Sequence, residues 1–247
     1  MTFIRSALFF ICFWIWSAIM NLAFLPMLAF DRLWIVRGQT LWTKGIIFLM
    51  RAICGLKIEI RGQENIPKGA GLIACKHQSA FETMAFHELL RDPAMVLKKE
   101  LLNIPIYGWY CRKTKMIAVD RKGHASALKA MIAQSQEALN DNRPIVIFPE
   151  GTRSPLDSNL PYQPGIAALY SKLNVPVTPI ALNSGLFWPR KKFICRPGTL
   201  IIEFLPAIEP GLKRKDFMAQ LKTQIENRTV ELIKDGRQTH FSGSKDT

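Results

Sequence analysis

A histidine and an acid lie close together between Lys76 and Glu82. The apolar run before them, residues 72–75, indicates a short strand, and residues 82–90 indicate a helix. A carboxylate on the first turn of that helix can hold one imidazole nitrogen of His77. The other nitrogen is then left to take a proton from a hydroxyl. This spacing predicts His77 as a general base and Glu82 as the acid that orients it.

The spacing by itself is weak evidence. With four histidines and 19 acidic residues in 247, a pair of this kind arises by chance in about one such chain in three. His87 and Asp92 have the same spacing, but they fall within the predicted helix. Five residues turn a helix through roughly 500°, which leaves these two side chains about 140° apart around the axis. His87 is therefore interpreted as an ordinary helical residue.

A second polar motif, Phe148–Ser154, directly follows the predicted strand 144–148. Ligands of open α/β sheets bind at this carboxyl edge of the strands. Gly151 allows a sharp turn, and Arg153 offers a planar fork to a phosphate. Glu150 could anchor Arg153 or the turn. The alternative is a solvated loop with a structural Glu–Arg pair.

Further cations follow two other predicted strands. Lys98 and Lys99 come after residues 95–97, and Arg121 comes after residues 116–119. The three could gather around one anion, although each taken singly is a surface charge. The chain contains neither a G-x-S-x-G elbow nor a P-loop. The glycine-rich run 69–74 precedes a strand instead of following one, so it is interpreted as a turn.

Alternating strands and helices predict an α/β domain with a mixed, largely parallel sheet covered by helices. Its later helices are expected at 124–140, 165–173 and 217–233, and its other strands at 57–61, 175–182 and 199–205. The expected division is an N-terminal helix pair (1–56), the α/β domain (57–235) and a polar, frayed tail (236–247).

The N-terminal pair indicates a membrane. No charged residue occurs from Ser6 to Phe30, which is long enough for a spanning helix. In the next segment, 33–56, Arg37, Lys44 and Arg51 fall on one side of a helix and suit a membrane interface. One span plus an interfacial helix, or a hairpin entering one leaflet, both fit. Two buried core helices are the remaining alternative.

The net charge of +14 attracts an anionic partner, either nucleic acid or anionic lipid. The apolar N-terminus favours lipid, so no nucleic-acid partner is expected. Basic residues after the first helix place the main domain on the cytoplasmic side of the cytoplasmic (inner) membrane. The five cysteines form no C-x-x-C pair, so neither a metal site nor a disulfide framework is predicted.

Taken together, the motifs resemble those of the membrane-bound 1-acylglycerol-3-phosphate acyltransferases, within the glycerolipid acyltransferase superfamily. The resemblance runs from about residue 72 to 182. Phe148–Ser154 matches the family's phosphate-binding block, and His77-Gln78-Ser79 with an acid at position 82 matches its catalytic block. Residues 98–108 match the lysine-containing block, and residues 175–180 match the apolar block that closes the acyl site.

The resemblance implies that His77 is the base and that Glu82 orients it. Arg153, with Lys98 or Lys99, would hold the phosphate of lysophosphatidic acid. The acyl group would arrive as a thioester on coenzyme A or acyl carrier protein and give phosphatidic acid, a step of phospholipid biosynthesis that needs no metal and no other cofactor. The expected substrate-binding set is Lys98, Lys99, Arg121, Glu150, Gly151, Thr152 and Arg153.

Two positions depart from the family pattern. Glu82 stands where the family usually has aspartate, and Lys76 stands where it often has asparagine. These departures leave two alternatives open. One is a relative that acts on another lysolipid, such as a lyso-ornithine lipid, and the other is a catalytically silent lipid-binding protein of the same fold.

Overall fold

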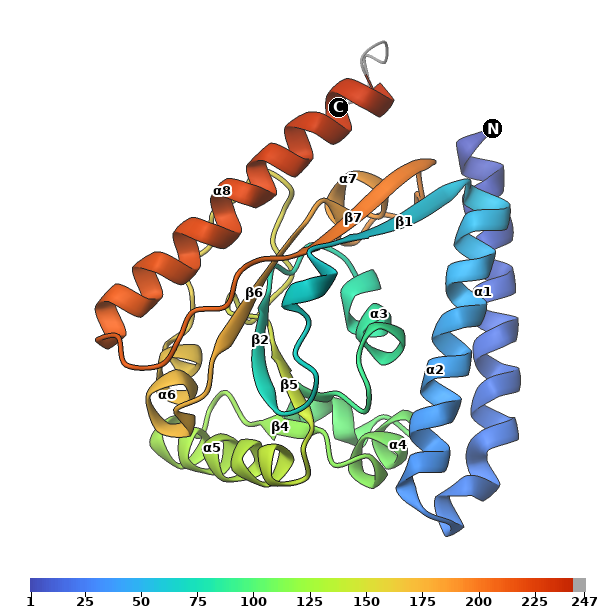
Figure 1. Cartoon of the computed structure of the whole chain (residues 1–247). Coiled ribbons are helices and arrows are strands. Elements are labelled where there is room, and N and C mark those ends of the chain that lie inside the picture. Colours follow the sequence, from blue (N-terminus) through green and yellow to red (C-terminus); the bar gives the residue numbers. More distant parts are fainter. Residues whose placement is uncertain (242–247) are drawn as a thin grey trace.

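A seven-stranded sheet forms the centre of the molecule (Figure 1). The computed structural model describes residues 1–241 of the chain. In the order β1-β7-β6-β2-β5-β3-β4, every neighbouring pair is parallel except β6 with β7. The prediction of a mixed, largely parallel α/β sheet is therefore confirmed. The strands are β1 (Leu56–Arg61), β2 (Gly71–Cys75), β3 (Ala94–Lys98), β4 (Ile117–Val119), β5 (Pro144–Ile147), β6 (Val177–Leu182) and β7 (Gly198–Phe204).

The central strand β2 shows how helices enclose the sheet, because its successive side chains point to opposite faces. Ile73 and Cys75 join a core with α3 and the N-terminal helices. Leu72 and Ala74 join a second core with α5, α6 and α8. Both faces are thus covered, as Figure 1 shows. The helices named here are α3 (Phe81–Leu89), α5 (His124–Asn140), α6 (Pro164–Leu173) and α8 (Arg214–Phe241).

Three helical features differ from the sequence prediction. The short helices α4 (Tyr107–Lys113) and α7 (Ser184–Phe187) were not predicted, since each is too short to show a helical period. Residues 236–241, expected as frayed tail, continue α8. Gly236 lets α8 approach α7 closely, because a Cβ there would meet Leu186 at 2.7 Å. The rest of the expected tail, 242–247, lies outside the described residues.

The N-terminal segment folds into a helical hairpin along one flank of the domain (Figure 1). Helix α1 (Thr2–Phe24) ends near Pro26 in a short 3₁₀ turn, and α2 (Arg32–Leu49) follows. Asp31 caps α2 by accepting a hydrogen bond from the N–H of Leu33 (2.8 Å). By length and composition, residues 2–29 could cross a membrane, with a mean hydropathy of 2.1 and 17% of the most apolar window buried. That small buried share argues against a buried core helix for α1.

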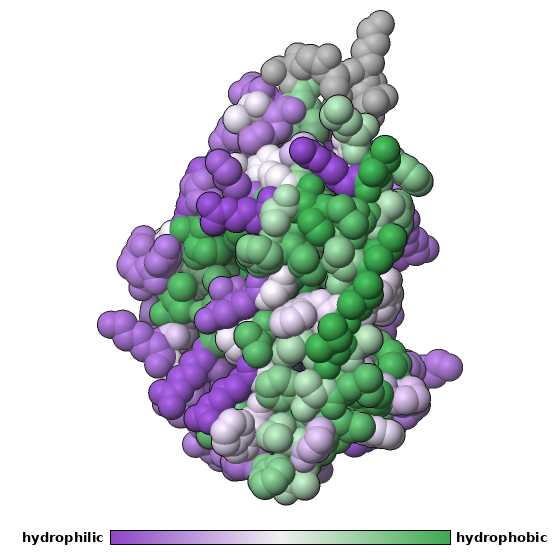
Figure 2. Space-filling model, turned by 90° about the vertical axis from the view of Figure 1, so that its right-hand side faces the viewer, coloured by the Kyte–Doolittle hydropathy of each residue, from purple (hydrophilic) through white to green (hydrophobic). Residues whose placement is uncertain are grey.

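The outward face of the hairpin is a large apolar surface. Figure 2 shows apolar side chains along this flank with hydrophilic ones beside them. Soluble surfaces rarely expose so large an apolar patch without an interaction that covers it. The largest exposed apolar side chains on the two helices are Phe3, Ile4, Leu8, Ile11, Trp14, Ile15, Ile19, Leu22, Leu33, Trp34, Leu41 and Phe48.

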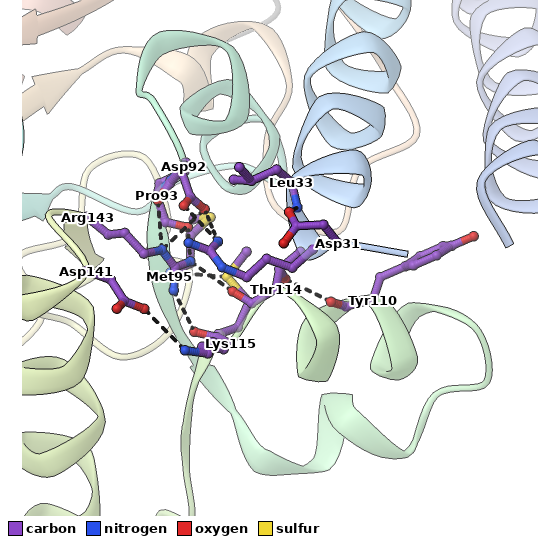
Figure 3. A network of polar contacts seen from close by, with 12 residues as sticks. Asp31, Leu33, Asp92, Pro93, Met95, Tyr110, Thr114, Lys115, Asp141 and Arg143 are labelled. Atoms are coloured by element: carbon purple, nitrogen blue, oxygen red, sulfur yellow. Dashed lines mark hydrogen bonds and ion pairs between the residues drawn. The ribbon is translucent and has the colours of Figure 1, made fainter. Parts of the chain in front are cut away.

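Polar contacts hold the hairpin on the domain (Figure 3). The buried guanidinium of Arg143 pairs with Asp92 (3.2 Å), and Asp92 also pairs with Arg32 of α2 (2.7 Å). Nearby, the hydroxyl of Tyr110 in α4 donates to the carbonyl of Asn21 in α1 (2.5 Å). These contacts tie both helices of the hairpin to the domain.

Candidate active site

His77 lies just beyond the carboxyl end of β2, beside the loop that follows β5. Its side chain is 12% exposed, and its ring stacks on Phe148 with centroids 4.1 Å apart. Ser154 donates to the carbonyl of His77 from its backbone N–H (2.7 Å) and from its hydroxyl (2.9 Å). Because β2 and β5 are parallel neighbours, their carboxyl ends bring the two predicted motifs together.

Glu82 is fully buried on the first turn of α3. Its carboxylate accepts hydrogen bonds from the N–H groups of Gln78 and Ser79 (3.0 Å each) and from the hydroxyl of Ser184. Burial raises the pKa of Glu82 from its ordinary 4.5 to about 7, and these hydrogen bonds act in the opposite direction. The carboxylate of Glu82 is therefore hydrogen-bonded both by the loop before α3 and by Ser184 of α7.

The structure brings Glu82 and His77 together without closing a hydrogen bond. Oε2 of Glu82 lies 3.9 Å from Nδ1 of His77, beyond the usual range of about 2.7–3.2 Å. That buried Nδ1 has no hydrogen-bond partner within residues 1–241. Catalytic hydrogen bonds are often long without substrate and tighten when substrate binds. The pair is thus near the geometry that the predicted roles require.

The imidazole of His77 is uncharged at neutral pH. Burial, together with the smaller effect of the positive charges of Arg153, Arg190 and Arg121, lowers its pKa from 6.5 to about 3. A neutral imidazole can act as a base. An anion that binds among the arginines offsets their charge, so the pKa of His77 rises and the base becomes stronger when that anion is present.

A buried ionic cluster supports the backbone under His77. Nζ of Lys76, 1% exposed, lies 2.7 Å from Glu150 and 2.8 Å from Glu226 of α8. The other carboxylate oxygen of Glu150 accepts the N–H of His77 (2.9 Å). Glu150 thus joins the two motifs through Lys76 and His77, and within the described residues it forms no ion pair with Arg153. Sequence reasoning missed Glu226, because nothing local relates residues so far apart.

The loop after β5 carries the predicted phosphate-binding residues. Gly151 has a φ of +67°, a conformation that favours glycine. The guanidinium of Arg121 contacts the carbonyl of Gly151, and Nη1 of Arg190 donates to the carbonyl of Arg153 (2.5 Å). Thr152 lies half-buried between Gly151 and Arg153. Arg121 therefore contacts the loop that carries Arg153.

The two lysines stay farther out. Lys98 ends β3, the neighbour of β5, and Lys99 follows it; both are exposed. Lys99 lies 3.4 Å from Asp120. Arg190 was not among the predicted site residues, yet its positive charge lowers the pKa of His77. The strand-end rule does not reach Arg190, because α7 (Ser184–Phe187) separates it from the end of β6 at Leu182.

Comparison with known proteins identifies the family of this chain. Residues 57–183 match the family model described as Acyltransferase. The 1-acyl-sn-glycerol-3-phosphate acyltransferase of Pseudomonas aeruginosa is 36% identical over 185 residues, which cover 75% of this chain and 72% of that protein. The human 1-acyl-sn-glycerol-3-phosphate acyltransferase alpha is 27% identical over 213 residues, covering 82% and 75%.

A solved structure has the same fold. The crystal structure of the 1-acyl-sn-glycerophosphate (LPA) acyltransferase PlsC from Thermotoga maritima aligns with a TM-score of 0.76. The alignment covers 94% of this chain and 98% of that one at 20% sequence identity. With the family model and the Pseudomonas relative, the resemblance predicted from the two motifs is confirmed: the chain belongs to the acyltransferase family.

Proposed function

We propose that this acyltransferase transfers a fatty acyl group from a thioester to the free hydroxyl of lysophosphatidic acid, giving phosphatidic acid. The observation that carries the proposal is an uncharged histidine with a buried carboxylate at one nitrogen and arginines around it. The names of the relatives, which specify 1-acyl-sn-glycerol-3-phosphate, support the same acceptor.

In the proposed step His77 takes the proton of the acceptor hydroxyl. The hydroxyl oxygen forms a bond to the thioester carbonyl carbon, and backbone N–H groups stabilise the oxyanion that results. The carbon–sulfur bond then breaks, and the thiolate takes the proton back from the imidazolium. Glu82 stabilises the imidazolium between these two transfers. The step needs no metal and no cofactor besides the donor, an acyl thioester of coenzyme A or acyl carrier protein.

The arginines would hold the phosphate of the acceptor, with Arg153 as its main contact. We expect Arg153→Gln to raise the KM for lysophosphatidate about 10- to 100-fold, because a charge-assisted fork to phosphate is lost. The measurement is thiol release by membranes that carry the protein, with acyl-CoA as donor. Gly151, Thr152, Arg121, Lys98, Lys99 and Glu150 remain predicted members of this site.

The same assay tests the alternative acceptor, because a lyso-ornithine lipid has no phosphate. If Arg153 holds the phosphate, the substitution affects lysophosphatidate and leaves turnover of lyso-ornithine lipid within about threefold of wild type. Equal losses on both acceptors would contradict the assignment of Arg153. Faster wild-type turnover of lyso-ornithine lipid would replace the proposed acceptor with that lipid.

We further propose that the hairpin inserts into one leaflet of the cytoplasmic membrane, with the domain on the cytoplasmic side. Separate turns of α1 contact the domain: the rings of Phe9 and Trp188 have centroids 5.6 Å apart, and the carbonyl of Asn21 accepts a hydrogen bond from the hydroxyl of Tyr110. A helix held along its length in this way leaves its outer apolar face for lipid. The basic residues of α2 favour the cytoplasmic side.

Membrane binding through apolar contact resists salt. We expect the protein to stay with membranes at about 1 M salt, where the Debye length is about 3 Å. Ile11→Glu with Trp14→Glu, both on the exposed face of α1, should release it into the soluble fraction. The control pair Gln220→Glu and Gln238→Glu adds the same charge on exposed positions of α8. Release of wild type by salt alone would contradict the apolar contact.

A further inference from the structure

A second group of cations follows β6, on the other flank of β2 from the predicted phosphate site. In the sheet, β2 lies between β5 and β6. Arg121 and Arg153 follow β4 and β5, whereas residues 190–192 follow β6 and α7. Arg190 contacts the loop of the first group through the carbonyl of Arg153, whereas Lys191 and Lys192 are exposed and form no hydrogen bond or ion pair with that loop among the described residues. The second group, Arg190, Lys191 and Lys192, is called the β6 cations below.

The β6 cations border a cavity of about 440 Å³. This volume lies within the usual range for small-molecule sites, about 300–1,000 Å³. Its other lining residues include Gln78, Ser154 and Leu156. Gln78 follows His77 in the chain, and Ser154 donates twice to the carbonyl of His77. The cavity therefore opens directly beside the candidate base.

Nothing in the described chain neutralises the β6 cations. None of the three lies within 4.0 Å of a carboxylate in residues 1–241. The N–H of Lys192 donates to the carbonyl of Pro189 (3.2 Å), which closes a turn with Lys191 at a φ of +59°. A left-handed conformation is uncommon for lysine. The turn presents both exposed lysines at the rim, with Arg190 half-buried behind them.

A buried amide beside the cavity also lacks a partner. Gln78 is 1% exposed, and its Oε1 accepts the N–H of Gly185 (3.2 Å). Its Nε2 has no acceptor among residues 1–241. A buried donor without an acceptor is unfavourable, so a ligand carbonyl at this point would satisfy it. A ligand for this cavity thus combines carbonyl acceptors, apolar stretches and an anionic end.

We propose that this cavity binds the 4′-phosphopantetheine arm of the acyl donor, with the β6 cations contacting its phosphate. The arm has two amide carbonyls, short apolar stretches and a phosphate, and it ends in the sulfur that carries the acyl group. Coenzyme A and acyl carrier protein share this arm. The inference rests on the proposed acyl transfer, because it assigns the donor phosphate to the β6 cations beside the site predicted for the acceptor.

The test compares two soluble donors that differ only in the phosphate, the acyl thioesters of 4′-phosphopantetheine and of pantetheine. In wild type, the thioester that carries the phosphate should have the higher kcat/KM. In Lys191→Gln/Lys192→Gln we expect the ratio of the two kcat/KM values to fall about tenfold, mostly through KM, because two contacts to the phosphate are lost. The control Lys213→Gln/Lys215→Gln removes the same charge from exposed positions before and within α8 and should leave the ratio unchanged.

The two natural donors are then measured with the same variants. A lower kcat/KM of Lys191→Gln/Lys192→Gln with acyl-CoA, with acyl-acyl carrier protein or with both supports the inference. The donor that is affected is the one that uses the cavity. An active wild type whose ratio is unaffected in Lys191→Gln/Lys192→Gln would overturn this inference alone. No thiol release by wild type from any thioester would overturn the proposed acyl transfer, and this inference with it.

Discussion

Replacing His77 by alanine is expected to lower kcat for acyl transfer about 10³-fold, since the step then lacks a general base. A hydroxyl hardly ionises at neutral pH, and no other described histidine contacts Glu82. The KM for lysophosphatidate should change much less, because the arginines rather than the imidazole would hold the phosphate. Thiol release with acyl-CoA and lysophosphatidate measures both constants, and a thermal melt confirms folding.

The matched control is His87→Ala, which removes the other histidine of the same region. His87 lies in α3, and burial lowers its pKa to about 4. Its loss could reduce stability, but kcat should stay within about threefold of wild type. A folded His77→Ala protein with normal thiol release would end the assignment of the base. A wild type that binds lysolipid vesicles and never releases thiol would instead support the silent lipid-binding alternative.

Glu82→Gln is expected to reduce kcat about 10²- to 10³-fold with the protein still folded. An amide can keep the hydrogen bonds from Gln78 and Ser79 through its oxygen. Its NH₂ group then faces Nδ1 of His77 and donates to it, so the proton of the neutral ring moves to the other nitrogen. That nitrogen must be free to take the proton of the hydroxyl. In other enzymes with a histidine base, a wrong tautomer of this kind lowers kcat severely.

The pH dependence of kcat/KM distinguishes ionisation of Glu82 from ionisation of the acceptor phosphate. Because the pKa of Glu82 is raised to about 7, kcat/KM of wild type should rise with pH through that value as Glu82 ionises. His77, with a pKa of about 3, contributes no limb there. Glu82→Gln should remove the rise, whereas a limb due to the phosphate of the acceptor would persist in the variant. Persistence of the whole rise would show that Glu82 is not the titrating group.

The same shift has a consequence for stability. The folded pKa of Glu82, about 7, exceeds its ordinary 4.5, so the folded state holds a proton that the unfolded state has lost between these pH values. The contribution of Glu82 to the free energy of unfolding therefore decreases from pH 4.5 to 7. The difference in free energy of unfolding between wild type and Glu82→Gln isolates this contribution, because His77 titrates in both.

Glu82→Asp keeps the charge and shortens the side chain. If the wild type were inactive and this variant active, the inactivity would be due to the longer side chain of glutamate.

Local pattern was enough to predict the strands, the longer helices and the two motifs. A short apolar run followed at once by polar residues marks the end of a buried strand, and both His77 and the loop around Arg153 stand at such ends. The uncharged run from Ser6 to Phe30 likewise indicated the first helix of the hairpin. These features depend on neighbours a few residues apart, which periodicity and turn chemistry describe.

Contacts between distant residues were decided by the tertiary structure alone. Ser184 reaches Glu82 across 102 residues of chain, and Glu226 reaches Lys76 across 150. Arg190 comes close to His77 because β6 pairs with β2 in the sheet. Gly236, in the part of α8 that was expected as tail, packs against Leu186 of α7, about 50 residues earlier in the chain. The strand order and the docking of α8 determine which strand ends meet, and these depend on burial over the whole chain rather than on any local run of residues.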